Sequence, residues 1–246
     1  MAGPHTEKPE INRTVLITGA TSGLGTYLAH AFARAGYVVV LHGRDEAKLR
    51  AIKNQVLDKN RISCATVVGD LLDAKGLSAV LSAMRTQDID ILVNNAGIDP
   101  ELTSGGVKGD IKDINAIFST NATSAIALCY GAFEHFLTKG GGDIVNMNSV
   151  AGMRGSDHEP LYAASKFGLR GFSESVKEAW LKQGIRMTDI YSGAIATGMA
   201  SHRPDVKDLI DPQELAEFIV GLCAPDSFFV REISVQKTKK KPESGK

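Results

Sequence analysis

The stretch that decides the fold is TVLITGATSGLG, residues 14–25. Its first residues form a β-branched and apolar run typical of a buried strand, and glycine follows at once. From Leu24 to Ala35 apolar residues recur at helical spacing until Gly36 interrupts them. These residues therefore predict a strand, a glycine-rich turn and a helix.

The same alternation continues along the chain, and its strands are almost continuous runs of Val, Ile and Leu. Such strands are buried on both faces, which is typical of a parallel sheet covered by helices on each side. The segment 111–139 is compatible with one long helix or with two shorter ones. We therefore expect an α/β fold of about seven strands. Further strands are expected at 37–41, 62–68, 89–93, 144–148, 185–191 and 230–235, and further helices at 45–59, 74–85, 161–183 and about 211–223.

Length and composition favour one domain. The 246 residues are 43% apolar, which is enough to bury a core, and no linker divides them. We expect a single domain over 1–246, with flexible tails at 1–12 and 237–246. Lys plus Arg and Asp plus Glu both number 28, so no net charge attracts nucleic acid or an anionic membrane.

The three cysteines are far apart and have no metal-binding spacing, so we expect reduced thiols and no metal site.

No uninterrupted apolar run reaches the roughly 18 residues that a membrane helix needs. We therefore expect a cytoplasmic protein.

The glycine turn suggests a nucleotide site. Gly19, Gly23 and Gly25 allow a tight turn and a close approach of the backbone to a pyrophosphate at the helix N-terminus. By itself this spacing is weak evidence, because a merely structural glycine turn can also have it. Its position between a strand and a helix favours dinucleotide binding.

The end of the second strand indicates which dinucleotide. NAD sites usually carry an acid there, whereas this chain has Leu41-His42-Gly43-Arg44. A guanidinium can pair with the 2′-phosphate of NADP, and Asp45 is better explained as the cap of the next helix. NADP(H) is therefore favoured over NAD(H). Ser22 weakens the argument, because some NADP enzymes have a basic residue in the glycine turn.

Tyr162 and Lys166 lie one helical turn apart on the same face of a predicted helix. A free phenol has a pKa of about 10, and a nearby ammonium lowers it. Ser149, thirteen positions upstream of Tyr162, would stabilise charge on a carbonyl oxygen. Serine commonly ends a strand, so Ser149 alone would carry little weight.

With these residues, the chain resembles the short-chain dehydrogenase/reductase family, in its branch of about 250 residues with a Tyr-x-x-x-Lys motif. It is similar to the 3-oxoacyl-carrier-protein reductase-like members. The resemblance covers residues 14–235 and implies a doubly wound Rossmann fold, an αβα sandwich with strand order 3-2-1-4-5-6-7. Its motifs, in order, are Gly19, Gly23 and Gly25; Asp70-Leu71; Asn94-Asn95-Ala96-Gly97; Asn121; and Ser149, Tyr162 and Lys166.

The resemblance also implies roles. Tyr162 would be the general acid or base, and Ser149 would hydrogen-bond the substrate oxygen. Lys166 would bind the nicotinamide ribose and favour the tyrosinate, while Asn121 would hold a water that links Lys166 to solvent. The implied cofactor-binding residues are Gly19, Thr21, Ser22, Gly23, Leu24, Gly25, Arg44, Asp70, Leu71, Asn95, Ala96, Gly97, Tyr162, Lys166, Gly193, Ile195 and Thr197.

Two regions bear on the substrate. Ser192 stands where the family usually has proline, which restores a backbone N–H and would loosen this loop. The segment after Ser149 carries Arg154 and His158, from which we hypothesise a small polar or charged substrate. Alternatively, these charges simply face solvent, as loop charges commonly do. A predicted lid at 198–210 adds further charges, at His202, Arg203 and Asp205.

The expected function is NADP(H)-dependent interconversion of a carbonyl and a secondary alcohol. The alternative is a catalytically idle NADP-binding sensor or scaffold on the same fold. Small and apolar residues on two helices favour a homo-oligomer, a tetramer or a dimer, although core packing also explains part of this pattern. Examples are Ala122, Ala125, Ala127, Ala132 and Phe133.

Overall fold

The computed structural model describes residues 13–60, 62–103, 109–201 and 205–238. Its seven strands form one sheet in the order β3-β2-β1-β4-β5-β6-β7, and every pairing between neighbours is parallel. The predicted fold class and strand order are therefore confirmed. The strands are β1 (Thr14–Ile17), β2 (Val38–Gly43), β3 (Cys64–Val68), β4 (Ile91–Asn94), β5 (Gly142–Ser149), β6 (Ile185–Ser192) and β7 (Glu232–Val235).

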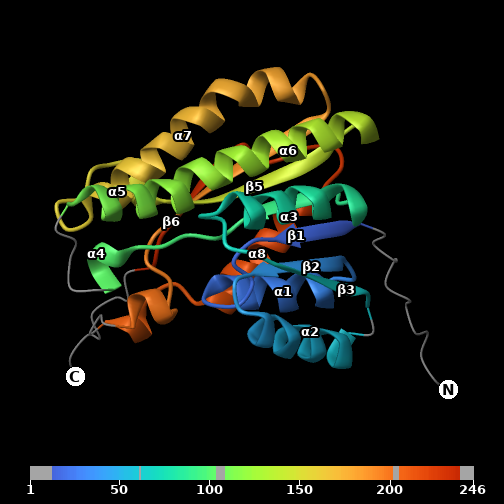
Figure 1. The fold of residues 1–246 in the computed structure, drawn as a ribbon, viewed down its shortest axis with the longest axis horizontal. Helices are drawn as coiled ribbons and strands as arrows, with labels where there is room; N and C mark the ends of the chain where they lie inside the picture. Colours follow the sequence, from blue (N-terminus) through green and yellow to red (C-terminus); the bar gives the residue numbers. More distant parts are fainter. Residues whose placement is uncertain (1–12, 61, 104–108, 202–204, 239–246) are drawn as a thin grey trace, which may run out of the picture.

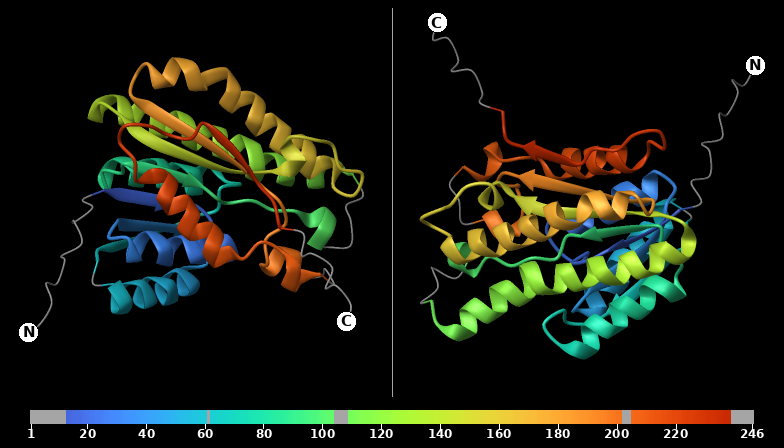
Figure 2. Two further views of the ribbon diagram at one scale, coloured as in Figure 1. Left: turned by 180° about the vertical axis from the view of Figure 1, so that it is seen from behind. Right: turned by 90° about the horizontal axis from the view of Figure 1, so that it is seen from above.

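Helices cover both faces of the sheet (Figure 1). On one face lie α1, α2 and α8, and on the other α3, α6 and α7. Figure 2 shows from behind that α8 lies on the same side as α1, which it packs against. The helices are α1 (Leu24–Arg34), α2 (Glu46–Asn60), α3 (Ala74–Thr86), α4 (Pro100–Thr103), α5 (Ile111–Phe118), α6 (Ser124–Lys139), α7 (Pro160–Leu181) and α8 (Pro212–Cys223).

The strands supply side chains to two separate cores. In β1, Val15 and Ile17 point into the core beneath α1 and α8, whereas Leu16 points into the core beneath α3 and α6. All three side chains are fully buried. Because successive side chains of a strand alternate between faces, this explains why the strands are almost continuously apolar.

Capping residues fix where two predicted helices begin. The Asp45 side chain accepts a 3.0 Å hydrogen bond from the Lys48 amide at the start of α2. Asp211 accepts hydrogen bonds from two amides at the start of α8, with Pro212 at the first position. Both arrangements follow ordinary capping chemistry. The short helix α4 and the 3₁₀ turns Val150–Gly152, Gly198–Ala200 and Val206–Asp208 were not predicted.

The sequence is compatible with one long helix or two shorter ones over segment 111–139. The structure shows one continuous helix that contains an irregular turn. Helices α5 and α6 are joined by a π-helical turn, Ser119–Thr123, which contains Asn121. Such turns are rare and often occur at functional sites. The helix Ile111–Lys139 is also long and apolar enough to cross a membrane by length and composition, but it packs against α3, α7 and the sheet.

Several expectations concern residues outside the described ranges. These are most of the two predicted tails, residues 1–12 and 239–246, and the lid residues His202 and Arg203. Lys237, which was assigned to the tail, is described, and its ammonium lies 3.1 Å from the Asp205 carboxylate.

Candidate functional site

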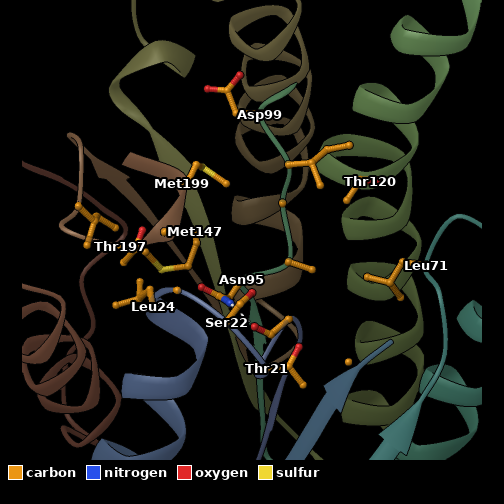
Figure 3. A pocket seen from close by; sticks show the side chains of 18 of the residues that line it. Thr21, Ser22, Leu24, Leu71, Asn95, Asp99, Thr120, Met147, Thr197 and Met199 are labelled. Atoms are coloured by element: carbon orange, nitrogen blue, oxygen red, sulfur yellow. Dashed lines mark hydrogen bonds between the residues drawn. The ribbon is translucent and has the colours of Figure 1, made fainter. Parts of the chain in front are cut away.

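A cleft of about 510 Å³ lies where β1 to β6 end at the carboxyl edge of the sheet (Figure 3). The order of the strands reverses there, because β1 lies between β2 and β4. Open parallel sheets bind their ligands at this kind of position. Most residues predicted to bind a cofactor line this cleft, and they are Gly19, Thr21, Ser22, Gly23, Leu24, Arg44, Asp70, Leu71, Asn95, Ala96, Gly97, Tyr162, Lys166, Ile195 and Thr197.

The glycine turn fits a pyrophosphate. Gly19 and Gly23 have φ values of +64° and +55°, which favour glycine. A Cβ atom at Gly25 would lie 2.1 Å from the Gly19 carbonyl oxygen, so this position admits no side chain. Gly25 therefore supports the turn rather than lining the cleft, and it lies in the first turn of α1, which begins at Leu24 with its N-terminus toward the glycine turn.

His42 supports the same turn and was missed at the sequence level. It is 2% exposed, and its Nδ1 accepts a 3.4 Å hydrogen bond from the Gly19 amide. Its Nε2 lies 3.1 Å from the Gly69 carbonyl, to which it donates. Burial lowers the pKa of His42, which agrees with a neutral ring that uses both nitrogens. The ring thus connects the turn after β1 to the end of β3.

Arg44 stands at the outer end of the cleft. Its guanidinium is largely exposed and lies 3.6 Å from the Asp70 carboxylate. An exposed ion pair of this kind contributes little to stability, so the guanidinium remains available to an anionic ligand. Gly193, by contrast, does not line the cleft, and its amide donates a 2.8 Å hydrogen bond to the Val235 carbonyl.

Asn121 is buried and fixes the loop that follows β4. Its Oδ1 accepts a 2.8 Å hydrogen bond from the Ile98 amide, and its Nδ2 donates a 2.8 Å hydrogen bond to the Ile98 carbonyl. Nδ2 also lies 3.2 Å from the Ser165 hydroxyl on α7. One amide therefore holds the loop after β4 and the helix that carries Tyr162 in a fixed relation.

Lys166 and Tyr162 depart from the expected electrostatics. Burial lowers the pKa of Lys166 to about 8, and its ammonium donates a 2.9 Å hydrogen bond to the Met147 carbonyl. Burial, and then the negative charge of Asp99, raise the pKa of Tyr162 above its ordinary value. The expectation that Lys166 would lower this pKa is not met, because the ammonium lies 5.6 Å from the ring centroid and burial dominates.

Ser149 lies at the end of β5, beside Tyr162. The two hydroxyl groups are hydrogen-bonded to each other, and the Ser149 oxygen also accepts a 3.1 Å hydrogen bond from the Ala151 amide. The strand end and the first turns of α7 thus place two hydroxyls where one carbonyl oxygen can meet both. Such an arrangement can polarise the oxygen and protonate it.

A second group of side chains near Tyr162 is acidic. Asp99 lines the cleft, and its carboxyl acts on the neighbouring Glu159 carboxyl. Burial, and then this contact with Asp99, raise the pKa of Glu159 to about 7. The Glu101 carboxylate accepts hydrogen bonds from the Leu161 and Tyr162 amides, at 3.3 and 2.8 Å, and so caps α7.

Comparison with known proteins adds to this geometry. The family model described as short chain dehydrogenase matches residues 13–207, which is most of the chain. The chain belongs to the short-chain dehydrogenase family. It is 28% identical over 231 residues to the 3-oxoacyl-[acyl-carrier-protein] reductase of Vibrio harveyi, with 89% of this chain and 92% of the relative covered.

Two solved structures of similar proteins contain NADPH. One is L-sorbose reductase from Gluconobacter frateurii with NADPH and L-sorbose, with TM-score 0.80, 25% identity, and 91% of this chain and 94% of that one covered. The other is a short-chain dehydrogenase from Sphingobium yanoikuyae with NADPH, with TM-score 0.79, 29% identity, and coverage of 91% and 87%. These similarities support a dehydrogenase or reductase that acts on carbonyl and alcohol groups and binds NADP.

Within this short-chain dehydrogenase, the two hypothesised substrate residues lie away from the cleft. Arg154 and His158 are exposed and do not line it, and the His158 side chain is 84% exposed. His158 lies 3.6 Å from Asp157, another exposed side chain. Their placement agrees with the alternative, in which these charges face solvent.

Ser192 also behaves differently from the expectation. Strand β6 continues through Ser192, which pairs with Ser149 of β5 and is buried. Regular strand pairing therefore continues through the position where the family usually has proline, and a serine there keeps the backbone N–H that proline lacks.

The Asp99–Glu159 contact predicts a pH dependence of folding. Glu159 has an ordinary pKa of 4.5, so between about pH 4.5 and 7 the folded protein holds a proton that the unfolded chain has released. Stability should therefore fall as the pH rises through this window. We expect Tm to decrease less between these pH values in Glu159→Gln than in the wild type, measured by thermal unfolding.

The matched control is Asp157→Asn, which makes the same kind of change at an exposed acid two residues away. Its pH dependence should follow that of the wild type. Parallel pH profiles for the wild type and Glu159→Gln would contradict the raised pKa.

Proposed function

We propose that this chain is an NADP(H)-dependent oxidoreductase that interconverts a carbonyl and a secondary alcohol on a small polar substrate. The observation that carries the proposal is the hydrogen-bonded pair of hydroxyls, Ser149 and Tyr162, beside the same cleft whose other end is the glycine turn. The bound cofactor would supply the hydride.

The protein's own groups would handle the proton. Because the pKa of Tyr162 is raised, the phenol holds its proton at neutral pH and can donate it to a carbonyl oxygen as the oxygen gains charge. Ser149 would orient that oxygen and stabilise it by a hydrogen bond.

Lys166 and Asn121 would assist Tyr162 from within the protein. A Cβ atom at Gly97 would lie 3.4 Å from Asn121 Oδ1 and 3.9 Å from Lys166 Nζ, so a side chain at this position would touch both groups. A lysine with a pKa of about 8 exchanges protons readily near neutral pH. We propose that Lys166 binds the ribose and that it returns a proton to Tyr162.

The nucleotide end would be held by the glycine turn, Asp70 and Arg44. The turn's amides and the N-terminus of α1 suit the pyrophosphate. The exposed guanidinium of Arg44 suits the 2′-phosphate, which is why we propose a preference for NADP(H) over NAD(H).

The mechanism predicts the effect of removing one hydroxyl. Tyr162→Phe should lower kcat for NADPH-dependent carbonyl reduction by about 10²- to 10⁴-fold, the usual contribution of a general acid. The Kd for NADPH, measured by fluorescence titration, should change little. The control is Tyr27→Phe on α1, whose side chain is partly exposed and lies away from the cleft.

Retained turnover in Tyr162→Phe would overturn the assignment of the general acid. A wild-type protein that binds NADPH but reduces no carbonyl in a broad panel would favour the alternative, an idle NADP-binding sensor.

The cofactor preference predicts a selective effect at Arg44. Arg44→Ala should weaken NADPH binding by about 10- to 100-fold, the value of a charge-assisted hydrogen bond, and change NADH binding by less than about twofold. Fluorescence titration of both cofactors measures this. Arg50→Ala removes an exposed guanidinium from the neighbouring helix α2 and should change neither Kd. Equal losses for both cofactors in Arg44→Ala would contradict the preference.

The outer surfaces of α6 and α7 suggest self-association. Tyr130, Leu137 and Phe167 are exposed there, and Tyr130 lies next to the stacked rings of Phe133 and Trp180. Exposed apolar side chains of this size commonly mark an interface. We propose that the protein is a homo-oligomer, a tetramer or a dimer, formed through these helices.

A charge placed on this surface should dissociate the oligomer. We expect Phe167→Glu to have a lower mass than the wild type in analytical ultracentrifugation, because burying an unpaired carboxylate is costly. Phe228→Glu is the control, since Phe228 is exposed just before β7. A monomeric wild type would contradict the proposal.

The expected cytoplasmic location stays a prediction that rests on the lack of a long uninterrupted apolar run, and the expected absence of nucleic acid and membrane partners stays one that rests on the balanced charge. Cell fractionation tests the first, and association with the membrane fraction would contradict it.

A further inference from the structure

The first turn of α7 carries Tyr162, the third residue of the helix. The first amides of a helix have no partner within it, and helix ends fray unless other groups bind those amides. A general acid tolerates little of this, because misplacing a reacting group by about 1 Å can cost on the order of 100-fold in rate. The proposed general acid therefore stands where a helix holds its residues least firmly.

The residues next to this turn do not cap it. The side chain of Glu159, at the N-cap position, makes no capping hydrogen bond, and Pro160 has no amide hydrogen to donate. The first hydrogen bond within the helix runs from the Ala163 amide to the Glu159 carbonyl, at 2.9 Å. The amides of Leu161 and Tyr162 therefore need partners from elsewhere in the chain.

Glu101 supplies both partners from the short helix α4. Its Oε2 accepts a 2.8 Å hydrogen bond from the Tyr162 amide, and its Oε1 accepts a 3.3 Å hydrogen bond from the Leu161 amide. The residue is 7% exposed, and these hydrogen bonds, with the partial positive charge at the helix start, offset the cost of burying a carboxylate. Glu101 does not line the cleft, so it contacts the backbone of Tyr162 and not a bound substrate.

The carbonyl of Tyr162 is held as well. The Ser165 hydroxyl donates a 2.7 Å hydrogen bond to it, and Asn121 Nδ2 donates to that hydroxyl at 3.2 Å. Asn121 also binds the backbone of Ile98, which precedes Glu101 in the same segment. Both backbone polar groups of Tyr162 are thus joined by side chains to the segment that follows β4, and these contacts fix the point from which the phenol extends.

The remainder of α7 is held independently of Glu101. The helix packs against β5, β6 and α5 along its length. Loss of the Glu101 carboxylate should therefore disturb the first turn of α7 far more than the rest of the helix. A cap that served stability alone would have no reason to affect the reaction.

Resting on the proposed function, we propose that Glu101 is a positioning residue for the reaction. By holding the amide of Tyr162 it sets the place of the phenol relative to Ser149 and to the substrate oxygen.

Hydrogen exchange tests the structural half of the proposal. In Glu101→Ala the amides of Leu161 and Tyr162 should exchange about tenfold faster than in the wild type or more, because each loses a hydrogen bond to a charged acceptor. Amides in the second half of α7 should exchange as in the wild type. Hydrogen–deuterium exchange mass spectrometry of the full chain measures both.

Single-turnover kinetics test the catalytic half. The NADPH-loaded full chain is assayed with ethyl acetoacetate, hydroxyacetone, cyclohexanone and L-sorbose, and the ketone with the highest kcat/KM in the wild type is used for the variants. Glu101→Ala should lower the single-turnover rate of NADPH oxidation by about 10- to 100-fold. The KM for the ketone and the Kd for NADPH should stay within about twofold, because Glu101 does not line the cleft.

A conservative variant and a matched control separate positioning from stability. Glu101→Gln keeps the length of the side chain and an oxygen that can accept from the Tyr162 amide, so it should recover most of the rate that Glu101→Ala loses. Asp211→Ala removes from α8 a carboxylate that also accepts hydrogen bonds from two amides. It should lower Tm as a lost cap does, but leave the single-turnover rate within about twofold of the wild type.

The outcomes distinguish this inference from the proposed function. An unchanged single-turnover rate in Glu101→Ala, or unchanged exchange at Leu161 and Tyr162, overturns the positioning role and leaves the oxidoreductase assignment standing. An equal loss of rate in Asp211→Ala does the same, because the rate would then follow stability alone. A wild type that binds NADPH and reduces none of the four ketones contradicts both proposals.

Discussion

Two hydrogen bonds between the Asn121 side chain and the Ile98 backbone hold the structural elements of the site in fixed relative positions. Asn121 stands in the π-helical turn of the long helix, and its amide also reaches Ser165 on α7. The Ile98 loop carries Gly97 on one side and Asp99 on the other. Because a buried amide with all its partners present is strongly held in a low dielectric, this contact fixes three elements at once.

Burial shifts the pKa values of two central side chains, Lys166 and Tyr162, in opposite directions. Removing water disfavours the charged form of any group, so it lowers the pKa of Lys166 and raises that of Tyr162. The two effects bring a lysine that can release a proton close to a phenol that keeps one. Both shifts come mainly from burial, to which the packing of α7 against β5 contributes, rather than from direct contact between the two side chains.

The sequence predicts this fold well because its signals are local. Each strand is a continuous apolar run, and caps such as Asp45 and Asp211 mark helix starts within a few residues. The contacts that were missed join distant segments. Glu101 caps a helix sixty residues later in the chain, and Asp99 meets Glu159 at the same separation. No local pattern encodes such contacts, and none says whether a loop charge such as Arg154 points into a cleft or into water.

The charges of the cleft are arranged along its length although the whole chain is neutral. Arg44 stands at the end with the glycine turn, and Asp99 stands at the end with Tyr162. A dinucleotide phosphate would be attracted by the first end and repelled by the second, which helps to orient it. The same negative charge raises the pKa of the phenol and so keeps its proton in place. Asp99 and Glu159 thus act on the proposed general acid by their charge alone, without a direct hydrogen bond to its hydroxyl among the described contacts.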